Sequence, residues 1–506
     1  MTDVAVSWAF FLGYLALVGT AAFVGIRRVQ GFASFSVGDR RTSPVWVGLA
    51  LAANLTSAAT FVINPGLLYL YGLSGLLGYA VATPLGILLG LTVLTKAFRR
   101  VGDKTTALTV PHWIADRYGS RSLRFFFAGL SLLLITFLVL IVVGLTQVLS
   151  PVLGLPRLAT MAMVIVIPLV YVMLGGASAH TLTNSVQAVI MILVAVLLVG
   201  SGLSLVVGEP GLIARLAAID PVLAEPVNPE SLLFRSAFEV FVANFFVGIA
   251  VIVQPHVMSK ALYLRDERDV NVYLGVGFAA LILFFSVLAV GLFARVTLGG
   301  SLLPPDQVVA TYLLEQFGPI ARSVVTVGLV AAGFSTLEGL LVALSTIFAN
   351  DVYKPLARST GTDPDAADRR AIRLSKGFLV GLAPVVALLS WEQLVDPNLS
   401  VAILAQNGVY GLFAATFVPI LFGVFVPRVT TWGVTAAAVA ALLVHFGMYY
   451  GEVGPYWNNP AVPATFALIT SAVVAGLSLL VAKRPPESEP AALGRAAEAA
   501  APLHAS

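Results

Sequence analysis

The sequence predicts an all-α polytopic membrane protein with about 13 transmembrane helices. Three observations support this fold class. Of the 506 residues, 58% are hydrophobic and only 11% are charged, whereas soluble domains carry about 25% charged residues. The apolar residues form runs of about 20 residues, which is the length that crosses a bilayer as a helix. The basic residues lie almost entirely in alternate loops, as expected of the cytoplasmic loops of a membrane protein.

Thirteen apolar runs are long enough to be transmembrane helices. They lie at residues 5–26, 44–71, 74–98, 122–150, 157–175, 181–207, 233–258, 271–296, 322–349, 375–393, 400–427, 431–450 and 463–482. If the N-terminus is outside, 24 of the 29 Lys and Arg residues lie in inner loops or at inner helix ends. We therefore expect a multi-pass protein of the cell membrane, with the lipid bilayer as a partner and a cytoplasmic C-terminus.

The composition argues against several function classes. Cysteine is absent, so disulfides, thiolate metal sites and a Cys nucleophile are excluded. The five His are scattered and form no HExxH motif, and the chain has no Walker loop. An intramembrane enzyme would need a nucleophile–base pair or a metal set near the midplane, and none is evident, so we expect no enzymatic activity. The net charge of +4 arises in the topology-determining loops, and we expect neither a nucleic-acid partner nor an obligate protein partner.

The second apolar run has an unusual polar centre. Its sequence from residue 51 is LAANLTSAATFVINPG, which places Thr56, Ser57 and Thr60 at membrane depth before Pro65-Gly66. Irregular backbone at this depth is tolerated where protein or water covers it. The segment therefore predicts a broken helix whose freed carbonyls can ligate a cation. A kinked helix whose small residues serve only packing fits this segment equally well.

The ninth run places hydroxyl groups and a carboxylate near the bilayer midplane. Ser335 and Thr336 are adjacent, and Glu338 lies three residues after Ser335 on the same helix face. Two hydroxyls and nearby carbonyls are suitable ligands for a hard monovalent cation. The alternative is that both hydroxyls only bond carbonyls of their own helix. A carboxylate at this depth should face a cavity or a partner.

Other polar residues at membrane depth are Asn184, Gln187, Asn244, Gln254, Gln406 and Asn407. Asn184 and Gln187 share a helix face close to the inner surface. Gln254 precedes a proline and predicts a second helix break. Gln406 and Asn407 either line a cavity or pair with a neighbouring helix.

Four segments of this chain resemble the sodium:solute symporter family, in the right order and on the right spans. SAATFxxxPG from Ser57 is similar to the first core helix of the family, and GGASAHTLTNSVQAVIM at 175–191 to its GG-x(5)-TDxxQxxIM segment. QPHVMSKALYLRD at 254–266 and AAGFSTLEGLLVALSTIFANDVYKP at 331–355 resemble two further signatures. The resemblance covers roughly residues 5–482.

The resemblance implies a five-plus-five inverted-repeat transporter core with broken helices. One extra helix precedes this core and two follow it. The corresponding divisions are 1–43 (extra N-terminal helix and inner loop), 44–207 (first repeat), 208–427 (second repeat), 428–484 (two C-terminal helices) and 485–506 (disordered cytoplasmic tail).

The resemblance also implies a Na⁺ site. Its ligands are two carbonyls of the first core helix, which fall on Ala53 and Thr56, and three groups of the eighth core helix. These are the carbonyl of Ala332 and the hydroxyls of Ser335 and Thr336. A different anchoring, on Asn54, would shift the first pair to Ala52 and Leu55. We prefer the first anchoring because it keeps the later Pro-Gly in register.

Two departures from the family pattern matter. The Asp that is common near the inner end of the fifth core helix is Asn184 here, which removes a negative charge from the implied Na⁺ exit route. The polar pair that contacts sugars in the sugar-transporting branch falls on Ala59 and Thr60, and the alanine argues against a sugar. The predicted solute-binding residues are Ala59, Thr60, Asn244, Gln406 and Asn407, and the predicted ion-path residues are Asn184 and Glu338.

These observations predict Na⁺-coupled uptake of a small organic solute by alternating access. The pattern is nearest the pantothenate- and proline-type branches, so we expect a solute that bears a carboxylate, such as pantothenate, proline or a monocarboxylate. One alternative is a proton-coupled symporter that uses Glu338. Another is a non-transporting sensor of the same fold, although the chain carries no attached kinase or receiver domain.

Overall fold

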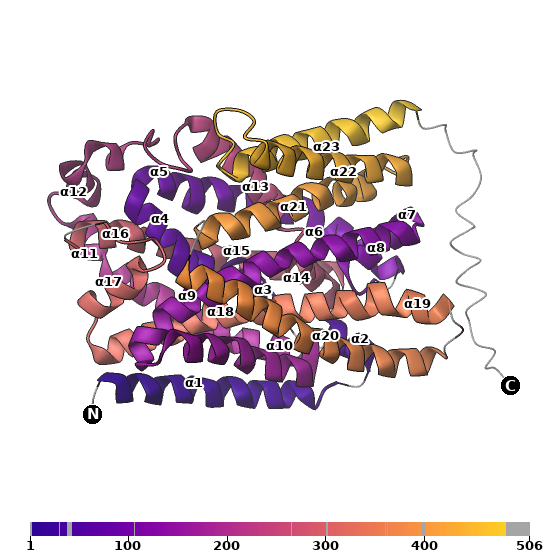
Figure 1. The fold of residues 1–506 in the computed structure, drawn as a ribbon, viewed down its shortest axis with the longest axis horizontal. Helices are drawn as coiled ribbons and strands as arrows, with labels where there is room; N and C mark the ends of the chain where they lie inside the picture. The colour runs from indigo at the N-terminus through magenta and orange to yellow at the C-terminus, as the bar shows by residue number, and fades with distance from the viewer. Residues whose placement is uncertain are drawn as a thin grey trace.

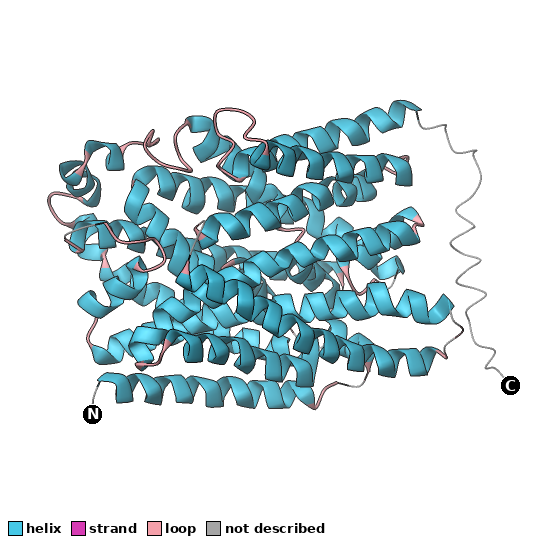
Figure 2. Ribbon diagram, in the orientation of Figure 1, coloured by secondary structure: helices cyan, strands magenta, loops and turns pink. Residues whose placement is uncertain are grey.

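The computed structural model describes residues 3–29, 31–37, 43–105, 107–264, 266–299, 302–359, 361, 363–396 and 400–481. Within these ranges the chain forms helices and loops and no strand (Figure 2), which confirms the predicted all-α class. The predicted disordered tail, 485–506, lies outside the described residues.

Ten continuous helical stretches of the described chain are long and apolar enough to cross a membrane. They are Asp3–Ile26 (α1), Leu73–Gly102 (α5, η2 and most of α6), Arg121–Leu153 (α8, η3 and α9), Arg157–Ser201 (α10), Glu267–Thr297 (α15, η7 and α16), Pro319–Ala357 (α18, η8 and part of α19), Asp365–Val395 (in α20), Val401–Phe425 (α21), Thr431–Tyr450 (α22) and Ala461–Val481 (α23). Two further spans are bent pairs, Pro44–Leu55 with Ala59–Tyr71 and Phe238–Val251 with Pro255–Tyr263. The described residues thus hold ten to twelve candidate spans, and the number thirteen stays a prediction.

The remaining helical elements either subdivide these stretches, where the winding changes between α, π and 3-10, or lie in the segments between them. In chain order they are α2 (Phe32–Val37), α3 (Pro44–Leu55), η1 (Ala59–Ile63), α4 (Asn64–Tyr71), α5 (Leu73–Leu76), η2 (Leu77–Ala82), α6 (Thr83–Thr105), α7 (Val110–Tyr118), α8 (Arg121–Leu130), η3 (Ser131–Leu134), α9 (Ile135–Leu153), α11 (Leu203–Val207), α12 (Leu212–Ile219), η4 (Pro221–Ala224), η5 (Phe238–Ala243), α13 (Asn244–Val251), α14 (Pro255–Met258), η6 (Ser259–Tyr263), α15 (Glu267–Ser286), η7 (Val287–Ala289), α16 (Val290–Thr297), α17 (Val308–Gln316), α18 (Pro319–Ile347), η8 (Phe348–Tyr353), α19 (Lys354–Ser359) and α20 (Pro364–Val395).

Helix α10 runs for 45 residues and bends at Gly176. The glycine has φ 51° and ψ −139°, and a Cβ there would lie 2.4 Å from the carbonyl oxygen of Phe35. Only glycine is suited to this conformation and this close approach. A straight helix of 45 residues would be about 68 Å long, far more than one bilayer crossing requires. The kink coincides with the short predicted loop between the fifth and sixth apolar runs.

The helices lie side by side, and the connecting segments gather at the two ends of the bundle (Figure 1). The end that holds α11, α12 and α17 carries the predicted outer loops, and the opposite end holds α7 and α19 from the predicted inner loops. Helix α1 forms one edge and α23 the other. Between them α18 packs against α1, α3, α9, α10 and α20, so it occupies the centre of the molecule.

Candidate functional site

The first bent pair breaks inside the polar segment that the sequence singles out. Helix α3 ends at Leu55 and η1 begins at Ala59, and the axis turns by 54° between them. The N–H and Oγ1 of Thr56 both donate to the carbonyl of Ala52, at 3.0 and 2.7 Å. The predicted break is confirmed, and so is the second one. Helix α13 ends at Val251, α14 begins at Pro255, and that bend is 57°.

Four of the five predicted Na⁺ ligands meet at this break. The Oγ of Ser335 donates to the carbonyls of Ala53 at 3.1 Å and Ala332 at 2.8 Å. The Oγ1 of Thr336 lies 3.4 and 3.5 Å from the same two oxygens. Both side chains are fully buried. The cluster therefore joins the broken helix α3 to the central helix α18. Thr56, the fifth predicted ligand, is also buried beside the break.

This cluster contains more oxygen lone pairs than protons. The hydroxyls of Ser335 and Thr336 supply one proton each and the helical N–H of Thr336 supplies one more to the Ala332 carbonyl, whereas the two carbonyls and two hydroxyls together offer eight lone pairs. The Thr336 contacts are at the upper limit of hydrogen-bond length. Uncharged oxygens that converge without enough donors are what a dehydrated alkali cation requires. The geometry suits a monovalent cation at this position.

The hydrogen bonds also distinguish the two possible registers of the first ligand pair. The carbonyl of Ala52 already accepts two hydrogen bonds from Thr56. The carbonyl of Ala53 instead faces the hydroxyls of α18. Ala53 is thus the carbonyl that faces α18, and the register with Ala53 and Thr56 stays a prediction.

Glu338 lies on α18 one turn further along and is fully buried. Its carboxylate accepts hydrogen bonds from Tyr171, from Thr183 and Gln187 at 2.6 Å each, and contacts Nδ1 of His180 at 3.3 Å. All four partners belong to α10. The prediction that this carboxylate faces a cavity or a partner is confirmed, because each of its two oxygens contacts two side chains of α10.

Asn184 belongs to a second polar chain that crosses three helices. Its Nδ2 donates to Oδ1 of Asn54 at 2.8 Å and to the carbonyl of Ala50 at 3.3 Å. Nδ2 of Asn54 in turn donates to the carbonyl of His256, at 3.2 Å. The chain therefore links α10, the end of α3 and the start of α14, the two broken helices included. It places Asn184 beside the break, although no contact joins it to Ser335 or Thr336.

The predicted solute-binding residues occupy different surroundings. Thr60 is buried and Ala59 is half-buried on η1. Nε2 of Gln406 donates to the hydroxyl of Tyr79 at 2.9 Å, so an amide and a phenol meet between α21 and η2. Among the predicted solute-binding residues, Gln406 thus forms a side-chain hydrogen bond between two core helices.

Asn244 contacts both its own span and α6, since its Oδ1 accepts from Oγ1 of Thr83 at 3.4 Å, whereas Asn407 contacts the peripheral helix α22. Nδ2 of Asn244 donates to the carbonyl of Glu239 at 2.8 Å, within the wide turn of its own span. Nδ2 of Asn407 donates to the hydroxyl of Tyr450 on α22 at 3.1 Å. Asn244 lies against η2, the segment that also holds Tyr79, whereas Asn407 faces away from it, and the role of both in solute binding stays a prediction.

The sequence analysis missed a buried lysine. It places Lys260 in an inner loop, but η6 packs inside the protein and leaves Lys260 only 1% exposed. Nζ lies 5.7 Å from the centre of the Tyr263 ring, and no carboxylate of the described chain is within 4 Å. Little in the sequence indicates that Lys260 is buried, because η6 is only five residues long and follows the helix break at Pro255.

The sequence analysis named Gln187 as a polar residue at membrane depth, but it assigned no partner to Glu338. Tyr171 and His180 lie in or beside apolar runs and carry no sequence pattern that points to Glu338. Tyr14 of α1 extends the cluster, because its hydroxyl accepts from Nε2 of Gln187 at 3.1 Å. Among the described residues no group of three or more His, Asp or Glu is arranged to hold a metal ion.

Comparison with known proteins identifies the family. The model of the sodium:solute symporter family matches residues 35–441. The sodium/pantothenate symporter of Haemophilus influenzae is 26% identical and is aligned over 86% of this chain and 88% of its own. The high-affinity proline transporter PutP of Bacillus subtilis is 23% identical, over 84% and 88%.

A solved structure has the same fold. It is the substrate-bound, outward-open state of a Na⁺-coupled sialic acid symporter, with a TM-score of 0.78 at 15% identity, and the alignment covers 94% of this chain and 98% of that one. The family match spans most of the sequence and both bent helices, and the related sequences are those of transporters. The chain belongs to the sodium:solute symporter family.

Proposed function

We propose that this protein couples the inward movement of Na⁺ to the uptake of a small, carboxylate-bearing organic solute. The observation that carries the proposal is the meeting of Ser335, Thr336 and the carbonyls of Ala53 and Ala332 at the break of α3. Family membership supports Na⁺ as the coupling ion. In this proposal Na⁺ is cargo that binds at the break and leaves again in each cycle.

The position of the cluster explains how Na⁺ binding would influence conformation. Three of the oxygens belong to α18 and one to α3, so a cation bound between them favours the state in which these helices lie together. A ligand shifts a conformational equilibrium only by binding one state better than the other. Because Na⁺ would bind only when Ala53 meets Ser335 and Thr336, its binding would stabilise that state and lower the cost of closing around the solute.

The solute class rests on the relatives and on the absence of a sugar-type pair at Ala59 and Thr60. The two relatives above carry pantothenate and proline, and both molecules bear a carboxylate. Thr60, Gln406 and Tyr79 supply hydroxyl and amide groups for the rest of such a solute. The half of the first broken helix that begins at η1 would hold the carboxylate, because helix N-termini attract anions.

The orientation in the cell membrane is part of the proposal. The basic residues concentrate in the loops that the structure gathers at the end of α7 and α19. This end would face the cytoplasm, with the N-terminus outside. A reporter fused after residue 483 should be active only on the cytoplasmic side, and one fused at the N-terminus only outside. The reverse pattern would refute the orientation.

The test of the function is uptake by purified protein in liposomes. Radiolabelled pantothenate, proline, monocarboxylates and a sugar would be offered with an inward Na⁺ gradient, with equal Na⁺ on both sides, and with K⁺ replacing Na⁺. We expect accumulation of one carboxylate-bearing solute only when the Na⁺ gradient is present. Accumulation of the sugar would refute the solute class, and equal accumulation with K⁺ would refute Na⁺ coupling.

A second candidate is proton coupling through Glu338. It is favoured by the contact of this buried carboxylate with His180 and Tyr171, since such groups can pass protons. In that case uptake should follow an inward proton gradient without Na⁺ and should vanish in Glu338→Gln. Uptake by the Gln variant on a Na⁺ gradient alone would exclude this candidate.

A further inference from the structure

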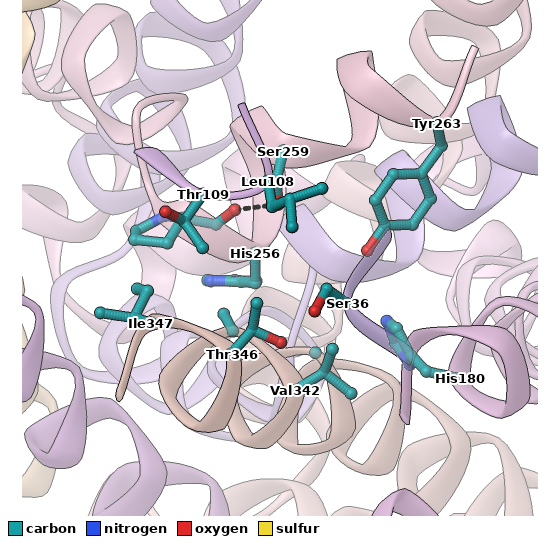
Figure 3. A pocket seen from close by; sticks show the side chains of 13 residues that line it. Ser36, Leu108, Thr109, His180, His256, Ser259, Tyr263, Val342, Thr346 and Ile347 are labelled. Carbon is teal, nitrogen blue, oxygen red and sulfur yellow. Dashed lines mark hydrogen bonds between the residues drawn. The ribbon is translucent and has the colours of Figure 1, made fainter. Parts of the chain in front are cut away.

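The two halves of the second broken helix have different surroundings. The later half, α14, contributes Pro255 and His256 to a small pocket beside α18 (Figure 3). The earlier half begins with η5, which packs against η2 and also against α23. Helix α23 belongs to the C-terminal hairpin, which consists of α22, the connector of residues 451–460 and α23. The family match ends at residue 441, within α22, so the connector and α23 lie beyond it.

Asn459 of the connector binds both ends of the turn that leads into η5. Its Nδ2 donates to the carbonyl of Leu233 at 3.0 Å and to Oε1 of Glu239 at 2.9 Å. Its Oδ1 accepts from the N–H of Ala461, at the start of α23, at 3.1 Å. The side chain is 2% exposed. A single buried amide therefore joins the start of α23 to both ends of segment 233–239.

Glu239 is a fully buried carboxylate with partners on both oxygens. Oε2 accepts from the N–H of Arg235 at 2.8 Å, and Oε1 accepts from Nη2 of Arg235 at 2.7 Å. The guanidinium also lies over the ring of Tyr456, a second connector residue, with Cζ 4.9 Å from the ring centre. A buried ion pair adds little stability compared with an apolar pair of the same shape. The geometry that it holds is therefore the better explanation for this pair.

The geometry of this turn determines where the amide of Asn244 lies. Nδ2 of Asn244 donates to the carbonyls of Glu239 at 2.8 Å and Val240 at 3.3 Å, both in the π-helical turn η5. The same nitrogen lies 3.0 Å from the position that a Cβ of Gly78 would take in η2. Asn244 is one of the predicted solute-binding residues. Its amide is therefore oriented by the backbone that Glu239 holds.

The other end of the turn determines where the ring of Phe234 lies. Phe234 directly follows Leu233, whose carbonyl accepts from Asn459. Its ring meets the ring of Tyr79 edge-on, with the centroids 5.0 Å apart. Tyr79 accepts from Gln406, and both residues belong to the proposed solute site. Both ends of the turn held by Asn459 thus lead to side chains of that site.

Apolar contacts hold the hairpin on the same face of η5. A hydrophobic cluster separate from the main core of the described residues joins η5 and α13 to α23. Phe238 of η5 lies 6.0 Å from Phe466 of α23, centroid to centroid, and Tyr410, one turn after Gln406 on α21, packs against the cluster. The buried members of the cluster are Ala243, Val247, Ala461, Val462 and Ala464.

We infer that Asn459 and Glu239 are positioning residues for the proposed solute site, and that the C-terminal hairpin thereby sets the affinity for solute. This inference rests on the proposed function. Neither side chain has to touch the solute, because both act through the backbone of segment 233–239. The inference gives a role to a segment beyond the family match and to a buried carboxylate that the proposed ion and solute contacts do not include.

The first test is the solute dependence of uptake by Asn459→Asp protein in liposomes. The substitution keeps the acceptor for Ala461, removes the Nδ2 donor and places a second carboxylate beside Glu239. The probes are radiolabelled pantothenate, proline and acetate, and the titration uses the one that wild type accumulates on a Na⁺ gradient. The half-maximal solute concentration should rise about tenfold, with the maximal rate within about twofold of wild type.

Ser478→Ala is the matched control for this variant. It removes a buried hydrogen bond of α23, from Oγ of Ser478 to the carbonyl of Ala475 at 2.6 Å, near the end of the helix that is remote from Asn459. The half-maximal solute concentration should not change in this control. A rise equal to that of Asn459→Asp would show that any weakening of α23 has the same effect, and it would overturn the specific role of Asn459.

A compensating pair of substitutions tests the contact itself. When Glu239→Gln is combined with Asn459→Asp, the amide and the carboxylate exchange places, so the hydrogen bond between the two positions is restored with its direction reversed. The double variant should regain at least about threefold of the lost affinity, since residues in contact do not act additively. A double variant with a half-maximal concentration as high as that of Asn459→Asp, or higher, would overturn this contact as the cause.

Hydrogen exchange provides a readout that needs no solute. In detergent, the backbone amides of η5 should exchange at least about threefold faster in Asn459→Asp than in wild type, because local opening becomes easier when a tertiary contact is lost. The amides of α14, in the other half of the same span, should exchange at the wild-type rate. Unchanged exchange in η5 would overturn the inference that the hairpin holds this turn.

The outcomes distinguish this inference from the function on which it rests. A wild-type protein that accumulates none of the three probes on a Na⁺ gradient would overturn the proposed function, whereas hydrogen exchange would still decide whether Asn459 holds η5. If wild type is active, a folded Asn459→Asp protein with an unchanged half-maximal concentration would overturn the inference. A lower maximal rate at an unchanged half-maximal concentration would also overturn it, because the contact would then serve folding alone.

Discussion

Ser335 and Glu338 lie one turn apart on α18, and the surroundings of their oxygens differ in one decisive respect. Around Ser335 two hydroxyl protons are shared among four oxygens, so lone pairs remain for a cation. Around Glu338 four donors from α10 contact two carboxylate oxygens, so its lone pairs are already used. Formal charge alone would have suggested the carboxylate as the cation ligand. The number of donors is the reason for proposing the uncharged cluster instead.

The comparison assigns different consequences to loss of each group. Removing an oxygen from the uncharged cluster should weaken Na⁺ binding and leave the fold intact. Removing the carboxylate should leave buried donors without acceptors and weaken the packing of α10 on α18. The following changes test this difference, from the largest expected effect to the smallest.

Glu338→Ala should be the most damaging substitution. It would leave Thr183, Gln187 and Tyr171 without their acceptor in a fully buried position, and losing one partner of such a network costs about 3–5 kcal/mol. We expect a clearly lower thermal unfolding midpoint in detergent and a reduced folded fraction by size-exclusion chromatography. Glu338→Gln keeps one acceptor and should lose less. A Glu338→Ala protein as stable as wild type would show that this network is not structural.

Thr336→Val should weaken Na⁺ binding without unfolding the protein. Losing one hydroxyl ligand costs about 1–3 kcal/mol, which is roughly a five- to 150-fold rise in the Na⁺ concentration for half-maximal uptake. Ser335→Ala and Thr336→Ala should behave in the same way, and the double variant should lose coupling. Thr336→Ser keeps the hydroxyl and should be mild. An unchanged Na⁺ titration of a folded Thr336→Val protein would refute the site.

Asn184→Asp should change the Na⁺ concentration for half-maximal uptake by a smaller factor than the Thr336 and Ser335 variants do. The new carboxylate would accept where Asn184 now donates to Asn54, so the Asn54 amide would turn and lose its bond with His256. The added charge beside the break should attract Na⁺ by about 1 kcal/mol, or roughly fivefold in the half-maximal concentration. Asn184→Ala should have only a small effect if Asn184 is not a ligand. Complete loss of uptake in an expressed Ala variant would show that Asn184 binds the ion.

The sequence predicted those features of this site that depend only on residues close together in the chain. A proline after a polar residue predicts a break at Gln254, and adjacent hydroxyls within an apolar run predict the cluster at Ser335. It could not predict which neighbour each side chain meets. Gln406 and Asn407 are adjacent but 100° apart on α21, so one meets Tyr79 and the other Tyr450. Such contacts depend on how distant helices pack.

Lys260 shows a different limit of sequence reasoning. A lysine that follows an apolar run is normally assigned to a cytoplasmic loop. Here the chain continues for one more helical turn inside the protein, because the break at Pro255 redirects the span. Hydropathy averaged over about 19 residues does not resolve a five-residue segment. The tertiary fold, rather than the local sequence, decides that this ammonium group is buried.

Tyr14→Phe should have the smallest effect, and it tests whether the donors around Glu338 depend on α1. The hydroxyl of Tyr14 accepts one N–H of Gln187, but Gln187 also donates to Glu338 at 2.6 Å and would keep that bond. The ring would keep its packing against Phe334, whose centroid lies 6.3 Å away. The expected loss is therefore about 0.5–1.5 kcal/mol of stability, the net value of one hydrogen bond.

The Na⁺ titration of Tyr14→Phe should match that of wild type, since no oxygen of the cluster at Ser335 is altered. Tyr14→Ala is the matched comparison, because it also removes the ring and should cost about 3–5 kcal/mol through the cavity it leaves. Thermal unfolding of the three proteins in one detergent measures both differences. A changed Na⁺ dependence in the Phe variant would mean that the cluster at Ser335 and the carboxylate of Glu338 are coupled through α10. The two groups would then not have the separate roles proposed for them.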